Sequence, residues 1–167
     1  MKKIIIFLTI LSFFAMGMSK KSTETETKEL ENSSSEKKAP DFSLKDLSGK
    51  QVNLKDFTDK KVVLLLFWTT WCGYCVQEIP ELKKLQEEFK DKDLEILAIN
   101  IKESKEKVES FVSKKGIKYI ILLDDGAVAK KYNVVGIPTN VIIDKNGNIK
   151  SYGDLPSIDF IEKIIKE

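Results

Sequence analysis

The sequence predicts an α/β domain in which a central mixed β-sheet carries helices on both faces and an N-terminal β-hairpin precedes the main strands. A continuous apolar run at residues 62–67 is typical of a central strand that is covered on both sides, and the largely apolar residues 94–101 form another strand. Other segments have apolar residues at three- and four-residue steps, as in helices with one buried face. Strands that alternate with helices in this way indicate a sheet between layers of helices.

The hairpin and the first helix open the domain. An extended segment begins at Ala39, residues 47–50 have turn chemistry, and residues 51–54 alternate as a second strand. A buried strand at 62–67 leads to a helix that runs from about Gly73 to Phe89, and Pro80 is expected to kink it. The buried stripe of this helix is formed by Cys75, Ile79, Leu82, Leu85 and Phe89.

Further strands and helices complete the predicted order β-β-β-α-β-α-β-α-β-β-α. They are a strand at 94–101, a helix capped by Ser104 and ended by Gly116, a strand at 119–123, a short helix at 126–132, a hairpin of 139–143 and 148–152 around an Asn-Gly turn, and a final helix capped by Ser157.

The first 38 residues are predicted to lie outside the folded domain. Two lysines precede an apolar run at 4–18, which is shorter than the ~20 residues of a membrane span and fits a signal peptide. A retained membrane anchor is the alternative. Residues 19–38 are mainly Ser, Thr, Glu and Lys, so we expect a disordered polar tether. The chain thus divides into a signal peptide or anchor at 1–18, a tether at 19–38 and a domain at 39–167. We expect the protein to be exported to the periplasm or the exterior of the cell envelope, where it is either soluble or tethered to the membrane by its N-terminus.

Composition excludes several classes of function. The net charge is +2, and the excess of lysine lies in the first few residues, so the domain itself is neutral and no nucleic-acid partner is expected. The chain contains neither His nor Arg. Without His, zinc hydrolysis and His-assisted triads are excluded, and two thiols cannot complete a zinc site. We therefore expect no metal and no cofactor.

The only two cysteines, Cys72 and Cys75, are separated by two residues, which is close enough to form and release a disulfide within one loop. Cys72 falls where the buried strand gives way to a helix, and the unpaired N–H groups and the dipole of a helix N-terminus favour a thiolate. Cys72 is therefore the predicted nucleophile, and Cys75, one turn further, the more buried resolving thiol. The alternatives are a permanent structural disulfide or two unrelated small core residues.

Several motifs occur together, in the order Ala39-Pro40-Asp41-Phe42, Phe67-Trp68, Trp71-Cys72-x-x-Cys75, Glu78-x-Pro80, Gly136-Ile137-Pro138-Thr139 and Ile143-Asp144-Lys145-Asn146-Gly147. On these motifs the domain resembles the thioredoxin superfamily, and specifically the extracytoplasmic TlpA/ResA-like thiol-disulfide oxidoreductases, whose domain is related to the AhpC/TSA redoxins. The resemblance covers essentially all of residues 39–167 and implies a thioredoxin-like fold.

The resemblance also implies roles for residues beside the cysteines. Glu78 matches a glutamate implicated in acid–base chemistry, although an ordinary exposed helix carboxylate is the alternative. Leu66 stands where cytoplasmic thioredoxins carry a buried Asp, so proton handling would fall to Glu78, to water or to the partner.

Pro138 resembles a cis-proline that would turn the backbone at Ile137 towards a bound substrate strand, and a trans proline that starts a strand is the alternative. Trp71, Gly73 and Tyr74 are expected to bind substrate beside the thiols, whereas Trp68 is expected in the core.

The predicted function is the reduction of disulfides in exported client proteins by a monomer that a membrane thiol reductant recharges. The resemblance implies apocytochrome c or methionine sulfoxide reductase as clients. A disulfide oxidase or isomerase is the main alternative, because Gly73-Tyr74 departs from the family, which often has Pro before the second cysteine. A peroxidase is disfavoured because Leu65 replaces a motif proline and the chain lacks Arg. A non-catalytic binding module is the remaining alternative.

Overall fold

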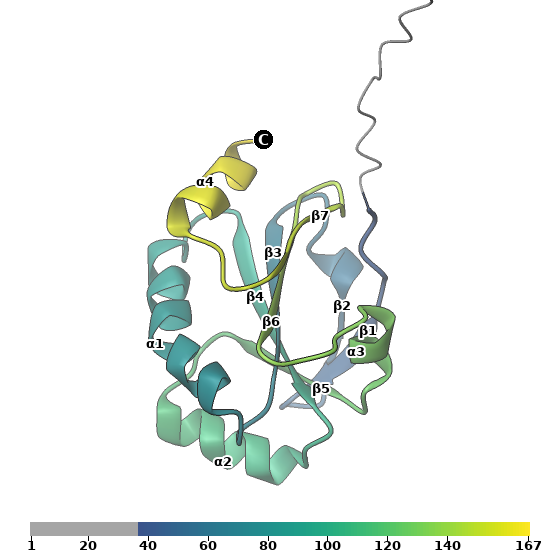
Figure 1. Ribbon diagram of the computed structural model, residues 1–167, viewed down its shortest axis with the longest axis vertical. Helices are drawn as coiled ribbons and strands as arrows, with labels where there is room; N and C mark the ends of the chain where they lie inside the picture. The colour runs from purple at the N-terminus through teal and green to yellow at the C-terminus, as the bar shows by residue number, and fades with distance from the viewer. Residues whose placement is uncertain (1–36) are drawn as a thin grey trace, which may run out of the picture. The chain divides into compact units, whose positions relative to one another are not determined.

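The structure is a computed structural model that describes residues 37–167, so the signal peptide or anchor and almost all of the tether lie outside the described residues. The elements follow the predicted order, with one added 3-10 helix, η1 (Figure 1). They are β1 (Ser43–Asp46), β2 (Gln51–Asn53), η1 (Leu54–Asp56), β3 (Val62–Trp68), α1 (Gly73–Glu88), β4 (Leu94–Ile101), α2 (Lys105–Lys115), β5 (Ile120–Asp124), α3 (Ala127–Lys131), β6 (Thr139–Ile143), β7 (Ile149–Gly153) and α4 (Ile158–Lys166).

The predicted second strand ends one residue early. The carboxylate of Asp56 accepts a hydrogen bond from the backbone N–H of Asn53 at 2.9 Å, and this capping box turns the chain into η1. Leu54 therefore belongs to η1, where its side chain is buried.

The seven strands form one mixed sheet in the order β2-β1-β5-β4-β3-β6-β7. β4 is the central strand of the sheet, and β3 lies beside it. β3 runs parallel to β4 and antiparallel to β6. All seven of its residues are buried, as the continuous apolar run predicts. In register, Trp68 pairs with Asn100 on β4, and Leu66 pairs with Asn140 on β6.

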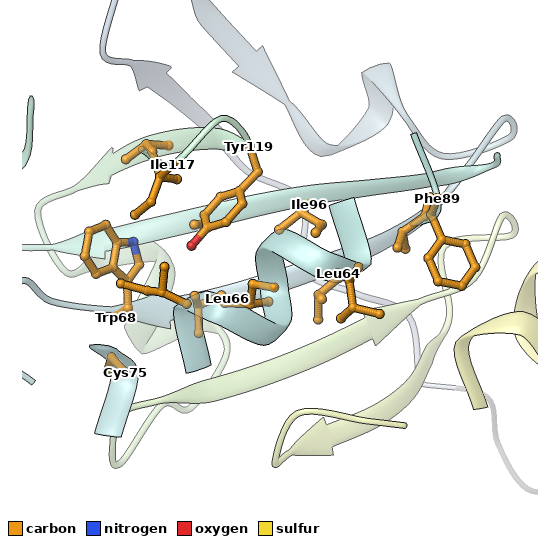
Figure 2. Close-up of a cluster of buried hydrophobic side chains, with 14 of the residues drawn as sticks. Leu64, Leu66, Trp68, Cys75, Phe89, Ile96, Ile117 and Tyr119 are labelled. Atoms are coloured by element: carbon orange, nitrogen blue, oxygen red, sulfur yellow. The ribbon is translucent and has the colours of Figure 1, made fainter. Parts of the chain in front are cut away.

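Helices cover both faces of this sheet. Alternate residues of β3 (Leu64, Leu66 and Trp68 among them) belong to one buried cluster with side chains of α1, α2 and α4 (Figure 2). The residues between them, such as Leu65 and Phe67, belong to a second cluster with side chains of η1 and α3. The two clusters confirm the predicted layers.

The first helix buries the predicted stripe, since every one of its five members is at most 5% exposed. α1 continues through Pro80 to Glu88. α2 begins and ends as predicted, because the Ser104 side chain accepts from the Lys107 N–H and Gly116 adopts φ +61°. Within residues 37–167, no helix is long and apolar enough to span a membrane.

Candidate active site

The two cysteines form a disulfide at the junction of β3 and α1. Cys72 is the N-cap residue of α1, and its Sγ accepts a hydrogen bond from the backbone N–H of Cys75 at 3.2 Å. The Cys72 carbonyl accepts the N–H of Val76, which starts the helical ladder. Because the N–H groups of a helix start stabilise negative charge, a thiolate at Cys72 would be favoured over one at Cys75.

Burial distinguishes the two sulfur-bearing residues only slightly in this oxidised state. Cys72 is 6% exposed and Cys75 is 1% exposed. Cys75 lies in the buried cluster between α1 and β3, which Figure 2 shows. Cys72 is the more accessible of the two, but only an edge of it reaches the surface.

The loop before β6 lies directly against Cys72. The peptide bond between Ile137 and Pro138 is cis, and the carbonyl oxygen of Ile137 is 3.6 Å from the Cys72 Sγ. The hydroxyl of Thr139 donates to the Gly136 carbonyl at 2.6 Å and closes this loop. Residues 65 positions apart in the sequence thus meet at the disulfide.

Glu78 lies one turn after Cys75 on α1 and is half-buried. Burial raises the pKa of its carboxyl group, and the negative charge of Asp154 acts in the same direction. A hydrogen bond from the Asn140 side chain opposes this rise. The Nδ2 atom of Asn140 lies 3.2 and 3.4 Å from the two carboxylate oxygens. Burial and the contact with Asn140 thus distinguish this carboxyl group from a freely solvated side chain.

Exposed apolar side chains surround the thiols. Trp71 is 69% exposed and Tyr74 is 73% exposed, on either side of Cys72. Val135, two residues before Ile137, is fully exposed. A groove of about 370 Å³ continues from Ile137 between Ile101 and Val134. Trp68, by contrast, is buried and packs against the ring of Phe111, as expected of a core residue.

Two polar residues at this site were missed by the sequence analysis. Asn140 is a buried amide in strand β6, just before three apolar residues, and Asn is uncommon in strands. Glu103 is a carboxylate with only 4% of its side chain exposed, and it follows directly after β4. Polar residues at the carboxyl end of a strand that is parallel to β3 were the available signal for Glu103.

Glu103 holds the loop that leads to Cys72. Its carboxylate accepts hydrogen bonds from the N–H and the hydroxyl of Thr70, at 2.6 and 2.7 Å, and from the Asn100 side chain at 2.8 Å. Lys107 forms an ion pair with it at 2.6 Å. Although burial alone would raise the pKa of Glu103, these donors together lower it to about 2. The carboxylate therefore stays ionised at any ordinary pH.

Comparison with known proteins gives the family. A model of the AhpC/TSA family matches residues 35–152. Among curated proteins, the chain is 40% identical over 114 residues to the thiol-disulfide oxidoreductase ResA of Bacillus thuringiensis, covering 68% of this chain and 65% of that protein. It is 44% identical over 115 residues to the thioredoxin-like protein YneN of Bacillus subtilis, covering 67% of this chain and 66% of that protein. The chain thus spans slightly less than two thirds of the length of these relatives.

A solved structure agrees with the fold. The thioredoxin domain of a thiol-disulfide oxidoreductase from Bacteroides vulgatus superposes with a TM-score of 0.69 at 29% identity, covering 78% of this chain and 95% of that one. The expectation of a thioredoxin-like fold is confirmed. With its family model matched along most of its length, and with its cysteine pair at the start of α1, the chain belongs to the AhpC/TSA family, on the branch of the ResA-like, thioredoxin-fold proteins.

Proposed function

We propose that this protein is a thiol-disulfide oxidoreductase that uses Cys72 and Cys75 to reduce disulfides in client proteins. One observation carries the proposal: the Cys72 Sγ occupies the N-cap of α1, where it accepts the Cys75 N–H, and it is joined in a disulfide to Cys75. The same sulfur thus lies where a thiolate is stabilised and next to the thiol that would resolve a mixed disulfide.

The reaction starts from the reduced protein. The Cys72 thiolate attacks one sulfur of a client disulfide, the client S–S bond breaks, and the second client sulfur leaves as a thiolate that takes up a proton. Cys75 then loses its proton and attacks the Cys72 sulfur, which releases the first client sulfur as a thiolate that takes up a second proton. The client gains two electrons and two protons, and the protein becomes the disulfide form that the structure shows.

Glu78 is the proposed proton acceptor for Cys75. The two residues are three positions apart on α1 and therefore lie on the same side of the helix. Leu66, which faces the same cluster as Cys75, has no ionisable group. A carboxyl group whose pKa is raised by burial is closer to the working pH and so is better suited to exchange a proton.

The client would dock on the surface around Cys72. Trp71 and Tyr74 offer exposed aromatic area, and Gly73 between them carries no side chain. The backbone at Ile137 and Pro138, in contact with Cys72, offers a place for an extended client segment beside the nucleophile. Large exposed apolar side chains around a reactive group support a protein client rather than a small molecule.

Reduction is favoured over oxidation and isomerisation because the pair Gly73-Tyr74 lacks the histidine found between the cysteines of the strongest oxidants. Thioredoxin-fold proteins range from about −270 mV in reductants to about −120 mV in strong oxidants. A measured potential near the upper value would reverse the proposed direction. Against a peroxidase, the position of its motif proline is held by Leu65, which is fully buried within β3.

The N-terminal residues support a place of action outside the cytoplasm. The basic and apolar segment at 1–18 supports export, with residues 19–38 as a tether. Exported clients with cysteine pairs, such as apocytochrome c or methionine sulfoxide reductase, and a membrane thiol reductant that returns the protein to its dithiol state complete the proposal. The protein would act as a monomer.

Trapping tests the activity. In Cys75→Ser the resolving thiol is absent, so client proteins should accumulate on Cys72 as mixed disulfides that a reducing agent releases. The variant with both cysteines changed to serine is the matched control and should trap nothing. If Cys75→Ser captures no protein and the wild type does not reduce insulin, the oxidoreductase proposal is wrong. A non-catalytic binding module would instead retain its partners in the double variant.

A further inference from the structure

Asn140 places a polar group where the fold otherwise has only apolar ones. It is 1% exposed and sits directly opposite Leu66 in the β3–β6 pairing, and directly paired residues of antiparallel strands project to the same face of a sheet. Leu66 and Cys75 belong to the same cluster on that face (Figure 2). Leu66 stands where cytoplasmic thioredoxins carry a buried Asp. On the neighbouring strand β6, Asn140 therefore supplies a polar side chain next to this position.

The amide of Asn140 is satisfied at one end only. Its Nδ2 atom contacts both oxygens of Glu78, whereas its Oδ1 atom is buried and has no hydrogen-bond partner among the described residues. A half-turn of the amide exchanges the two atoms. Because no described residue is hydrogen-bonded to Oδ1, this turn breaks only the contacts between Nδ2 and Glu78.

The two orientations suit the two states of Glu78. With Nδ2 towards it, the amide donates to the carboxylate; with Oδ1 towards it, the amide accepts from the carboxylic acid. We propose that Asn140 is a positioning residue that holds Glu78 against β6 in both protonation states by turning its side-chain amide. A proton carrier that keeps a partner before and after the transfer needs no rearrangement of its surroundings beyond the turn of this amide.

The other groups near Glu78 make no hydrogen bond to it among the described residues. Asp154, after β7, repels the ionised carboxylate, and Tyr119, before β5, is buried with its own pKa raised by burial and by Glu78. Cys75 lies on the same helix and is the group whose proton is exchanged. Among the described residues, Asn140 is the side chain that is hydrogen-bonded to Glu78, and its neutral amide offers both a donor and an acceptor.

The role of this pair in turnover rests on the proposed function, but the contact itself can be tested without activity. The pKa of Glu78 can be followed by carbon NMR of its carboxyl group in the wild type and in Asn140→Leu. Loss of the amide should raise this pKa by about one unit, because a hydrogen bond to a charged group is stronger than one to its neutral form. In Asn140→Asp, the two carboxyl groups should titrate in two widely separated steps.

Asn100→Leu is the matched control. Asn100 is another fully buried amide with an unpartnered Oδ1, but its Nδ2 donates to Glu103 instead. Its loss should leave the pKa of Glu78 unchanged. An unchanged pKa in Asn140→Leu, together with no coupling in a double-mutant cycle of Asn140 and Glu78, would overturn the proposal, even if the protein proves to be an oxidoreductase.

A double-mutant cycle tests the turn of the amide. Unfolding free energies of the wild type, Asn140→Leu, Glu78→Leu and the double variant give the coupling between the two side chains. Measured two pH units above and two below the pKa of Glu78, the coupling should persist at both values. A coupling that vanishes below the pKa would show that Asn140 serves the carboxylate alone, and the proposed turn would be wrong.

Discussion

Thr70 donates two hydrogen bonds to Glu103, one from its backbone N–H at 2.6 Å and one from its hydroxyl at 2.7 Å. Thr70 lies two residues before Cys72, the proposed nucleophile, and Glu103 lies between β4 and α2. The pair therefore fastens the loop that carries Cys72 to the end of the neighbouring parallel strand. The position of the sulfur depends on a carboxylate that is distant in sequence and does not touch it.

Loss of this carboxylate should destabilise the protein. In Glu103→Ala, the Thr70 and Asn100 donors lose their acceptor, and we expect the free energy of unfolding to fall by about 2–4 kcal/mol. Urea unfolding measures the change. Glu106→Ala is the control and should change stability little. Glu106 is an exposed glutamate in the first turn of α2 and forms no ion pair among the described residues. Equal effects of the two substitutions would contradict the role of Glu103.

The same carboxylate predicts acid sensitivity. The pKa of Glu103 falls from 4.5 to about 2 in the folded protein, so its ionised form stabilises the fold above pH 4.5. This contribution is on the order of 3 kcal/mol and is lost as the pH falls from 4.5 towards 2. The difference in unfolding free energy between the wild type and Glu103→Gln should therefore be largest near neutral pH and shrink in acid. A difference that is constant with pH would show that the charge plays no part.

Glu78 should affect the pH dependence of stability in the opposite direction to Glu103. Burial raises its pKa, so the ionised form is less favourable in the folded than in the unfolded protein, and this destabilisation grows as the pH rises through the folded pKa. We expect Glu78→Gln to be more stable than the wild type at pH 7 and no more stable in acid. The resolution of a mixed disulfide by Cys75 should slow by roughly 10²-fold, since a positioned base is lost. Stopped-flow kinetics and urea unfolding together measure the two effects, and an unaltered rate would remove Glu78 from the mechanism.

The exposed aromatic residues should affect client binding alone. Trp71→Ala and Tyr74→Ala remove side chains that are about 70% exposed, so the free energy of unfolding should change by less than about 0.5 kcal/mol. The KM for a protein disulfide should rise severalfold, while the rate with a small-molecule disulfide should stay the same. Parallel loss of activity towards both substrates would indicate damage to the thiols instead of lost docking.

Much of the fold could be predicted because its signals are local. The apolar run of β3, the buried stripe of α1 and the Asn-Gly turn before β7 each specify their element within a short stretch of chain. The end of β2 was misplaced by one residue, since the Asp56 side chain competes for the Asn53 N–H and starts η1. A hydrogen bond between a side chain and the backbone does not show in an alternating pattern.

The cysteine pair could be located from spacing, and the residues beside it from a motif, but Glu103 and Asn140 could not. Each acts through partners that the sheet brings close: Glu103 through β3–β4 pairing, and Asn140 through the β3–β6 register. Until the register is known, Asn140 is one polar residue among several, and Glu103 resembles an ordinary helix-flanking acid. Contacts of this kind follow from topology and not from sequence pattern.

The hydrogen bond from the Cys75 N–H to the Cys72 Sγ means that the atom proposed as the nucleophile also caps its helix. A substitution that removes the Cys72 sulfur therefore also changes the cap of α1 and can change the stability of the fold. Serine is a preferred N-cap residue, so Cys72→Ser abolishes the chemistry and keeps an acceptor at the start of α1, whereas alanine removes both. A difference in melting temperature between these two variants would measure what an acceptor at the N-cap contributes to stability, separately from the role of the sulfur in the thiol-disulfide reaction.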